Sequence, residues 1–459
     1  MRHHGGCGPG PWLRTMDTPI CDFVREYSGR NDLRLHMPGH KGTSFMGMEH
    51  LDITEIDGAD SLYEAGGIIA RSEANASDLF GCKTLYSTEG SSQCIRAMLY
   101  LVQLHARQKG LKPRIAAGRN AHKTFLTAAA LLDLDVDWLY PKENTGYLSC
   151  CLTAEDISSY LDKATEKPAA VYLTNPDYLG NMVDIESIAK VCHEKGVLLA
   201  VDNAHGAYLK FLPKSRHPMD LGADLCCDSA HKTLPVLTGG AYLHLSKEFA
   251  DEFGALAKHA MAIFGSTSPS YLILQSLDRA NAYLETYQKI LVPFLEQVDM
   301  VKRALQGYGY TLTGEEPLKI TIAAKSWGYY GTELSQILVK QGIVPEFADS
   351  DYLVLMVTPE TGREGLKRLE NVLKQIQKRE AIADPAPRLQ PAVQVMSIRE
   401  AMLSCSEVVP VSECLGRILA VPTVGCPPAV PIVACGERID SHSISCFDYY
   451  GIRECCVVK

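Results

Sequence analysis

Short apolar segments of strand type alternate with amphipathic helical segments through the middle of the chain, and this alternation narrows the choice of fold more than any other feature. The helical segments span residues 90–109 and 185–195, and each ends where a glycine follows. Such an alternation predicts an α/β domain around a mostly parallel sheet. The predicted strands cover residues 114–117, 170–174, 197–201, 224–227 and 241–245.

The pattern changes after residue 278, and 459 residues are too many for one ordinary domain. A long helical stretch over 278–307 precedes shorter strand and helix segments that predict a smaller α/β domain. Three prolines within 384–391 indicate a linker. We therefore predict an N-terminal extension and arm (1–60), a large domain (61–277), a small α/β domain (278–380), a Pro-rich linker (381–394) and a C-terminal domain (395–459).

Composition excludes several classes of protein. A formal net charge of −9 argues against nucleic acid as a partner, because phosphate binding favours a basic face. The chain has no run of about 18 apolar residues, so we expect no membrane span. Residues 1–16 lack the apolar core of a secretory signal and are interpreted as a loose extension, with Met16 as an alternative start.

Sixteen cysteines are more than a chain of this kind needs. The close ones are adjacent pairs, at 150–151, 226–227 and 455–456, rather than the CxxC spacing of zinc sites. Adjacent residues of a strand point to opposite faces, so these pairs are poor joint ligands. We therefore expect no metal, reduced thiols that act as small apolar side chains, and a cytoplasmic location.

The most specific motif is Ser229-Ala230-His231-Lys232-Thr233, directly after a predicted strand. A lysine that forms a Schiff base must keep its amine uncharged part of the time, which a partly desolvated position favours. The hydroxyl and imidazole side chains before Lys232 would reach a phosphate. An exposed lysine at a strand end is the simpler interpretation of this motif taken alone.

Three further positions agree with a phosphate-bearing aldehyde cofactor, pyridoxal 5′-phosphate (PLP). Asp202 ends an apolar strand, where a carboxylate would keep the PLP ring nitrogen protonated. Gly90, Ser91 and Ser92 open a predicted helix, whose N–H groups favour an anion. His122 follows another strand and would stack on the ring. The simpler alternatives are a turn-capping Asp, an ordinary Ser cap and a loop histidine.

Several widely separated motifs together resemble the Orn/Lys/Arg decarboxylases, in their short form without an N-terminal receiver-like domain. The resemblance implies a fold type I PLP-dependent, aspartate-aminotransferase-like enzyme, with a PLP-binding large domain and a decarboxylase-type C-terminal domain. The motifs occupy residues 35–42 (LHMPGHKG), 52–55 (DITE), 119–123 (RNAHK), 202–207 (DNAHGA), 229–238 (SAHKTLPVLT) and 266–271 (STSPSY), with Pro427-Pro428 and Gly436-Glu437 in the tail.

The resemblance also implies residue roles. Lys232 would be the Schiff-base lysine, Asp202 would pair with the ring nitrogen, and His122 would stack on one ring face. Ala204 would pack on the opposite face, with His205 near the substrate side. The residues implied for the phosphate are Gly90, Ser91, Ser92, Ser229 and His231. Thr267 would reach the site of a second subunit, which implies a homodimer or larger homo-oligomer with shared sites.

The implied reaction is α-decarboxylation of lysine, ornithine or arginine to a polyamine precursor. Lys232 and His231 are the candidate acids that return a proton to Cα, and His205 is a third candidate catalytic group. A cationic substrate needs an acidic partner, for which Glu437, Glu346 and Asp177 are candidates. The alternatives are an aminotransferase or β-eliminating lyase with the same cofactor, and a non-catalytic regulatory homologue.

The chain departs from the family pattern at several positions. Asn203 replaces the usual Glu, Tyr208 a His, Glu89 an Asn and Gly239 a Gln. The usual Tyr-Pro-Pro-Gly is Cys-Pro-Pro-Ala over 426–429. None of these changes involves Lys232 or Asp202, so the cofactor prediction stands while the choice of substrate stays open.

Overall fold

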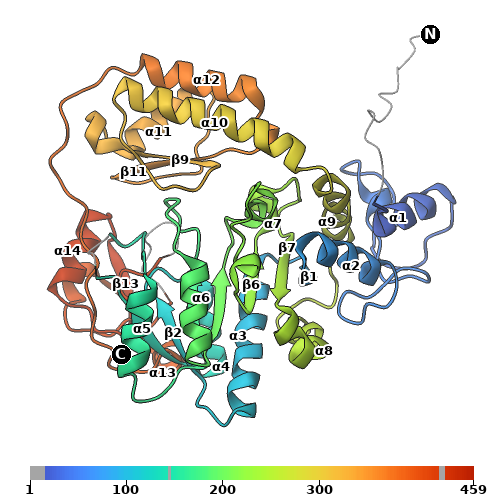
Figure 1. Ribbon diagram of the computed structural model, residues 1–459, viewed down its shortest axis with the longest axis horizontal. Coiled ribbons are helices and arrows are strands. Elements are labelled where there is room, and N and C mark those ends of the chain that lie inside the picture. The colour runs from blue at the N-terminus through green and yellow to red at the C-terminus, as the bar shows by residue number, and fades with distance from the viewer. Residues whose placement is uncertain (1–15, 143–145, 423–429) are drawn as a thin grey trace.

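The structure is a computed structural model that describes residues 16–142, 146–422 and 430–459. It contains a seven-stranded sheet flanked by helices, a four-stranded sheet above it, and a two-stranded sheet near the C-terminus (Figure 1). The Cys-Pro-Pro-Ala segment at 426–429 lies outside the described residues.

The large sheet has the strand order β1-β7-β6-β5-β4-β2-β3. Strands β2 to β6 run parallel, and β7 is antiparallel to both β1 and β6, which confirms the predicted mostly parallel sheet. Two strands were not predicted: β1, and the edge strand β3, whose two aspartates make it polar. The strands are β1 (Lys83–Ser87), β2 (Arg114–Gly118), β3 (Asp135–Leu139), β4 (Ala170–Thr174), β5 (Leu198–Asp202), β6 (Leu225–Asp228) and β7 (Ala241–Leu245).

Alternate side chains of the central strands bury against different helices, as the period of two in a strand requires. Ile115 and Ala117 of β2 pack with helices α3, α4 and α8, whereas Ala116 between them packs with α5 and α6. Both faces of the sheet are therefore covered. The helices are α2 (Ile68–Phe80), α3 (Ser91–Gln108), α4 (Lys123–Leu132), α5 (Ala154–Lys163), α6 (Ile185–Glu194), α7 (Ala230–Thr233) and α8 (Lys247–Ile263).

The second sheet lies beyond the carboxyl ends of the parallel strands (Figure 1). Its strand order is β10-β11-β9-β8, all antiparallel. Its elements are β8 (Leu312–Thr313), β9 (Lys319–Ala323), β10 (Phe347–Ala348) and β11 (Tyr352–Met356), with helices α10 (Gln288–Tyr308), α11 (Gly331–Lys340) and α12 (Gly362–Gln375).

The prediction of a single helical stretch over 278–307 is wrong. The structure has two helices, α9 (Tyr271–Leu284) and α10, and the chain turns between them. At the turn Tyr287 is fully buried and packs edge-on against Phe211, with ring centroids 5.7 Å apart. No glycine or proline marks this turn, so the local sequence does not reveal it.

The C-terminal region is more regular than its Pro-rich sequence suggests. Strands β12 (Ser406–Pro410) and β13 (Glu454–Val458) pair antiparallel, and helices α13 (Ile398–Leu403) and α14 (Ser441–Tyr449) pack beside them. A buried ion pair of 2.9 Å between Arg119 and Glu437 joins this region to the loop that carries His122. The C-terminal region is therefore attached next to the carboxyl ends of the parallel strands.

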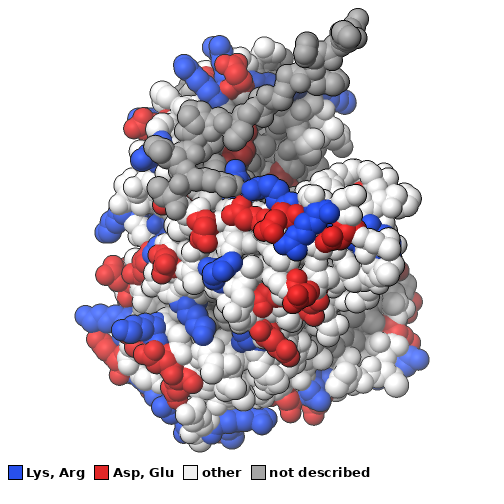
Figure 2. Space-filling model, turned by 90° about the vertical axis from the view of Figure 1, so that its right-hand side faces the viewer, with Lys and Arg blue, Asp and Glu red and all other residues white. Residues whose placement is uncertain are grey.

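The surface and the remaining elements complete the description. Acidic and basic side chains are interspersed on the face in Figure 2 rather than gathered into one basic area. Among the described residues, none of the helices has the length and apolar character needed to cross a bilayer. The remaining elements are α1 (Pro19–Gly29) and the 3₁₀ helices η1 (Glu49–Leu51), η2 (Ala207–Phe211), η3 (Pro218–Leu221), η4 (Ala324–Trp327), η5 (Pro359–Thr361) and η6 (Val411–Glu413).

Candidate active site

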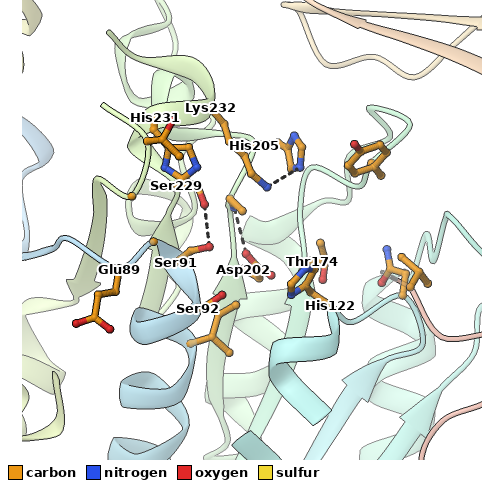
Figure 3. A pocket seen from close by; sticks show the side chains of 18 of the residues that line it. Glu89, Ser91, Ser92, His122, Thr174, Asp202, His205, Ser229, His231 and Lys232 are labelled. Carbon is orange, nitrogen blue, oxygen red and sulfur yellow. Dashed lines mark hydrogen bonds between the residues drawn. The ribbon is translucent and has the colours of Figure 1, made fainter. Parts of the chain in front are cut away.

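A cavity of about 370 Å³ lies at the carboxyl ends of strands β2, β4, β5 and β6 (Figure 3). This edge is where α/β sheets bind ligands, because successive strand-to-helix loops converge there. Every residue predicted for the cofactor or for catalysis lines the cavity except Thr267, and the three candidate acids Glu437, Glu346 and Asp177 are not among its lining residues. The lining includes Gly90, Ser91, Ser92, His122, Asp202, Ala204, His205, Ser229, His231 and Lys232, together with Glu89, Asn120, Thr174, Tyr178, Gly239 and Val430.

Lys232 lies in the short helix α7, one turn after β6 ends. Its Nζ is 3.2 Å from Nε2 of His205. Burial lowers the pKa of the Lys232 amine, and Asp202 and Glu346 act against this by raising it. A lysine with a lowered pKa supplies a nucleophilic free amine near neutral pH.

Asp202 ends β5 with its carboxylate directed into the cavity floor (Figure 3). Its Oδ1 accepts a hydrogen bond of 3.2 Å from the backbone N–H of Ala204, and its Oδ2 accepts one of 3.3 Å from the Tyr172 hydroxyl. Only 2% of the residue is exposed. The carboxylate is thus oriented by its neighbours and suits a protonated ring nitrogen as partner.

The start of α3 and the loop after β6 form a cluster of donors for an anion. Ser91 and Ser92 occupy the first turn of α3, where backbone N–H groups have no partner within the helix. The Ser229 hydroxyl donates to Oγ of Ser91 over 2.8 Å (Figure 3). These groups suit a phosphate.

Gly239 explains one departure from the family pattern. Its φ is +100°, and a Cβ at this position would lie 2.8 Å from the carbonyl oxygen of Thr88. The close approach lets Gly90 N donate to Gly239 O over 2.7 Å. The N–H of Gly90 is therefore already used, and the backbone donors for an anion begin at Ser91.

Glu89 does not place its charge against the anion cluster. Its carboxylate accepts a hydrogen bond from the backbone N–H of Ser266, and it points away from Lys232 and Asp202 (Figure 3). This contact also holds the loop that carries Thr267. Thr267 itself is exposed and does not line the cavity of its own chain, so its contribution to a second subunit stays a prediction.

Two histidines at the cavity have ring nitrogens committed to the backbone. Nδ1 of His122 accepts from the backbone N–H of Thr124 over 3.2 Å, so the proton of the neutral ring is on Nε2. Burial lowers the pKa of His122 and favours that neutral ring. His231 donates from Nδ1 to the Gly240 carbonyl over 2.9 Å, which fixes its ring beside the anion cluster.

His205 is buried between two lysines. Lys232 lies at Nε2, and Nζ of Lys319, from the small domain, lies 3.4 Å from Nδ1. Burial, then the charges of Lys319 and Lys232, hold the pKa of His205 well below its usual range. Lys319 was not predicted, because no motif surrounds it; the one available indication is a lysine within the apolar segment Leu318-Lys319-Ile320.

Two other departures from the family pattern turn away from the cavity. The Asn203 amide donates to Oδ1 of Asp228 over 2.6 Å. The Tyr208 hydroxyl donates to the Glu316 carboxylate and so links the large domain to the small one. Both residues are fully buried, and their contacts are structural.

The three candidate acids for a cationic substrate have different surroundings. Glu437 is paired with Arg119, and Asp177 accepts two hydrogen bonds of 2.8 Å from Asn181. Glu346 is exposed, accepts a hydrogen bond of 3.0 Å from the hydroxyl of Tyr178 in the cavity wall, and raises the pKa of Lys232. Glu346 is therefore the candidate that acts on the cavity while its carboxylate stays open to solvent.

A second histidine cluster surrounds Asp228, the last residue of β6 before α7. Nε2 of His217 and of His244 are each 3.0 Å from Oδ2 of Asp228, and all three side chains are fully buried. Within the described residues this is the one group with metal-ligand spacing. His217 accepts the backbone N–H of Met219 at Nδ1, so Nε2 carries its proton and donates to Asp228 instead of offering a lone pair to a metal.

The residues at the cavity fit PLP on their own chemistry. They combine an amine of lowered pKa, a carboxylate oriented at the opposite end, a hydroxyl and N–H cluster for a phosphate, and a neutral imidazole between them. Lys232, Asp202, Ser91, Ser229 and His122 would be the corresponding residues.

Comparison with known proteins agrees with this chemistry. Residues 18–307 match the family described as Orn/Lys/Arg decarboxylase, major domain, and residues 374–455 match its C-terminal domain. The uncharacterised protein YaaO of Bacillus subtilis is 28% identical over 94% of this chain and 93% of its own length. A Bacillus subtilis protein named arginine decarboxylase is also 28% identical, over 94% of this chain and 92% of its own length.

Solved structures share the fold at low identity. The lysine decarboxylase LdcF of Francisella novicida superimposes with a TM-score of 0.79 at 17% identity, covering 96% of this chain and 81% of that one. The constitutive lysine decarboxylase of E. coli gives 0.74 at 17% identity, covering 96% and 82%. These likenesses confirm the fold type I architecture. The family model spans well over half of the chain, which therefore belongs to the Orn/Lys/Arg decarboxylase family of PLP-dependent amino-acid decarboxylases.

Proposed function

We propose that the protein removes the α-carboxylate of a basic amino acid as CO₂, with Lys232 as the residue that binds PLP covalently. The observation that carries the proposal is the Lys232 amine, whose pKa is lowered by burial and which lies beside His205 in a cavity floored by Asp202. Bound PLP supplies the electron sink for the electron pair that departing CO₂ leaves on Cα.

The remaining residues position and protonate. Asp202 keeps the ring nitrogen of the cofactor protonated, and Ser91, Ser92 and Ser229 hold the phosphate. His122 would lie against the ring. Lys232 and His231, which both line the cavity, would return a proton to Cα, which turns the substrate into the corresponding amine.

Glu346 is proposed to recognise the cationic end of the substrate. The support is its exposed carboxylate, held by the Tyr178 hydroxyl beside the cavity, and its field at Lys232. Arginine is the first substrate to test, because relatives 27–28% identical over 94% of the chain are named arginine decarboxylase. A guanidinium would form a bidentate pair with this carboxylate.

We also propose that the protein is a homodimer. Apolar side chains in the segment 33–48 are strongly exposed in the single chain, with Leu33 at 83%, Met46 at 80% and Phe45 at 79%. A cluster of this kind marks an interaction surface. In such a dimer the loop with Thr267 would face the partner's cavity, and sedimentation analysis would measure the dimer directly.

The first test is CO₂ release from arginine, lysine and ornithine by the purified enzyme with added PLP. Lys232→Ala should abolish turnover and the visible absorbance of lysine-bound cofactor while the circular dichroism spectrum stays unchanged. Lys247→Ala, an exposed lysine at the start of α8, is the matched control and should behave as wild type. Wild-type turnover by Lys232→Ala would refute the proposal.

Substrate recognition is tested by Glu346→Gln. The variant should raise KM for arginine by roughly tenfold or more, since a charge-assisted hydrogen bond contributes about 1.5–3 kcal/mol, and should leave kcat largely unchanged. The matched control is Glu333→Gln, whose carboxylate caps α11 through Tyr330 N instead. An unchanged KM for every basic amino acid would remove Glu346 from the binding site.

A further inference from the structure

The small domain places a second lysine behind the candidate active site. Nζ of Lys319 lies 3.2 Å from the carbonyl oxygen of Asp177, 3.2 Å from that of Tyr178 and 3.4 Å from Nδ1 of His205. The residue is 3% exposed. An ammonium group has three N–H donors and no acceptor, so these three neighbours satisfy a charged Lys319 completely.

A charged Lys319 determines where the proton of His205 lies. If Lys319 donates to Nδ1, the neutral imidazole carries its hydrogen on Nε2. Nε2 faces Nζ of Lys232 at 3.2 Å, and an N–H donor can bond only to a lone pair. Lys232 accepts that bond only as the uncharged amine.

The surroundings favour a charged Lys319 and an uncharged Lys232 over the reverse arrangement. Burial lowers the pKa of Lys319, and Glu316 and Asp177 act against this by raising it. Two backbone carbonyls accept from its amine, and its Nζ lies 5.6 Å from the centre of the Tyr178 ring, so the contacts around Lys319 suit an ammonium group. The reverse arrangement needs a neutral Lys319 that accepts from Nδ1 and a charged Lys232 that donates to Nε2. Other charged or titratable groups also act on Lys319, His205 and Lys232. They are Asp177, Asp202, Cys227, Glu316, Glu346, His122 and His231.

We propose that Lys319 is a positioning residue that fixes the tautomer of His205, so that His205 donates to Lys232 and holds its amine free to react with the cofactor. The proposal rests on the proposed function of Lys232. Burial lowers the pKa of His205 and of both lysines, and the two carbonyl acceptors at Lys319 favour the charge there rather than on Lys232. The small domain thereby contributes to cofactor capture without touching the cofactor.

The test is the pH dependence of PLP capture by enzyme stripped of cofactor with hydroxylamine, followed by absorbance. Lys319→Met keeps the apolar stem and removes the charge. It should shift the apparent pKa of capture upward by about one unit, which slows capture at pH 7 about tenfold. Lys319→Arg should stay within about twofold of wild type, because it keeps the charge.

Lys302→Met is the matched control. Lys302 lies in the same domain and donates to two backbone carbonyls, those of Glu316 and Pro317, but has no contact with His205. Its removal should leave the capture profile unchanged. If Lys319→Met does not fold, Lys319→Gln repeats the test with an amide that still donates to the carbonyls.

The outcomes separate the two proposals. Borohydride reduction followed by mass spectrometry locates PLP on Lys232 or elsewhere, and a different lysine would refute the proposed function. PLP on Lys232 with an unshifted capture profile in a folded, uncharged Lys319 variant would refute the role of Lys319 alone. A downward shift would show the reverse arrangement and would also refute it.

Discussion

The molecule has two clusters around buried histidines, and the charged neighbours of the histidines have opposite signs. Lysines surround His205, whereas His217 and His244 face the carboxylate of Asp228. His205 is placed between two lysines, and burial together with those charges keeps the ring neutral. His244 faces Asp228, whose charge raises the pKa of the imidazole although burial acts against it. Both rings are buried, so the neighbouring charges decide their protonation states.

The difference separates a reactive arrangement from a structural one. Asp228 gathers donors from His217, His244 and Asn203, and all its partners are buried. Such a network holds the end of β6, just before the lysine motif, in one geometry. The cluster around His205 instead opens onto the cavity, where the proposed function requires a free amine on Lys232. The cluster around Asp228 therefore stabilises the fold, whereas the cluster around His205 is the one that the proposed function uses.

The largest expected effect comes from neutralising the structural cluster. Asp228→Asn should destabilise the fold by roughly 3–5 kcal/mol, because it leaves the buried histidines without their charged acceptor. Urea unfolding measures the loss. Asp162→Asn, which removes one carboxylate of an exposed ion pair with Lys195, should leave the unfolding midpoint unchanged. Equal midpoints for both variants would contradict the structural role of Asp228.

The next effect is a pair of opposite pH dependences. The folded-state pKa of His205 lies below the ordinary value of about 6.5, so the unfolded chain binds more protons just below that pH and the His205 contribution to stability is lost as the pH falls. The folded-state pKa of His244 is raised, so its contribution is full below about pH 6.5 and is lost as the pH rises through the raised value. Urea unfolding between pH 5 and 9 should give difference curves of opposite slope for His205→Gln and His244→Gln. Parallel curves would break the comparison.

The smallest effect concerns single hydrogen bonds at the edge of each cluster. Thr84→Val removes the 2.9 Å contact to Nδ1 of His244 and should cost about 1 kcal/mol of stability with activity unchanged. Tyr178→Phe removes the hydroxyl that holds Glu346 and should raise KM a few-fold while the unfolding midpoint stays constant. A loss of stability in Tyr178→Phe together with a changed KM in Thr84→Val would show that the structural and the functional cluster have been confused.

The sequence predicted the parts of the site that depend on short motifs and on the pattern of strands. Asp202 ends a strand, and His122 and Lys232 each follow one. Parallel strands bring their carboxyl ends together, so the motif and the strand pattern place these residues in one cavity. Lys319 and Tyr208 could not be predicted in this way. Their contacts join the large and small domains across more than a hundred residues, and no local periodicity records them.

The same limit applies to the fold. The buried central strands are continuous apolar runs and were predicted, whereas β3 carries aspartates because it lies at the sheet edge. The turn before α10 was missed because Tyr287 stabilises it through tertiary packing against Phe211. The departures at Asn203 and Tyr208 acquire a meaning only once their buried partners are known.

The ion pair between Arg119 and Glu437 joins two segments that are synthesised far apart in time. Translation completes the seventh strand of the large sheet at Leu245, but Val430 of the cavity wall and Glu437 follow only on the order of 10 to 40 s later at about 5–20 residues per second. Until then the buried guanidinium of Arg119 has no carboxylate. The residues of the cavity floor, Lys232 and Asp202 among them, are therefore synthesised before the Val430 part of its wall and before the carboxylate that pairs with Arg119.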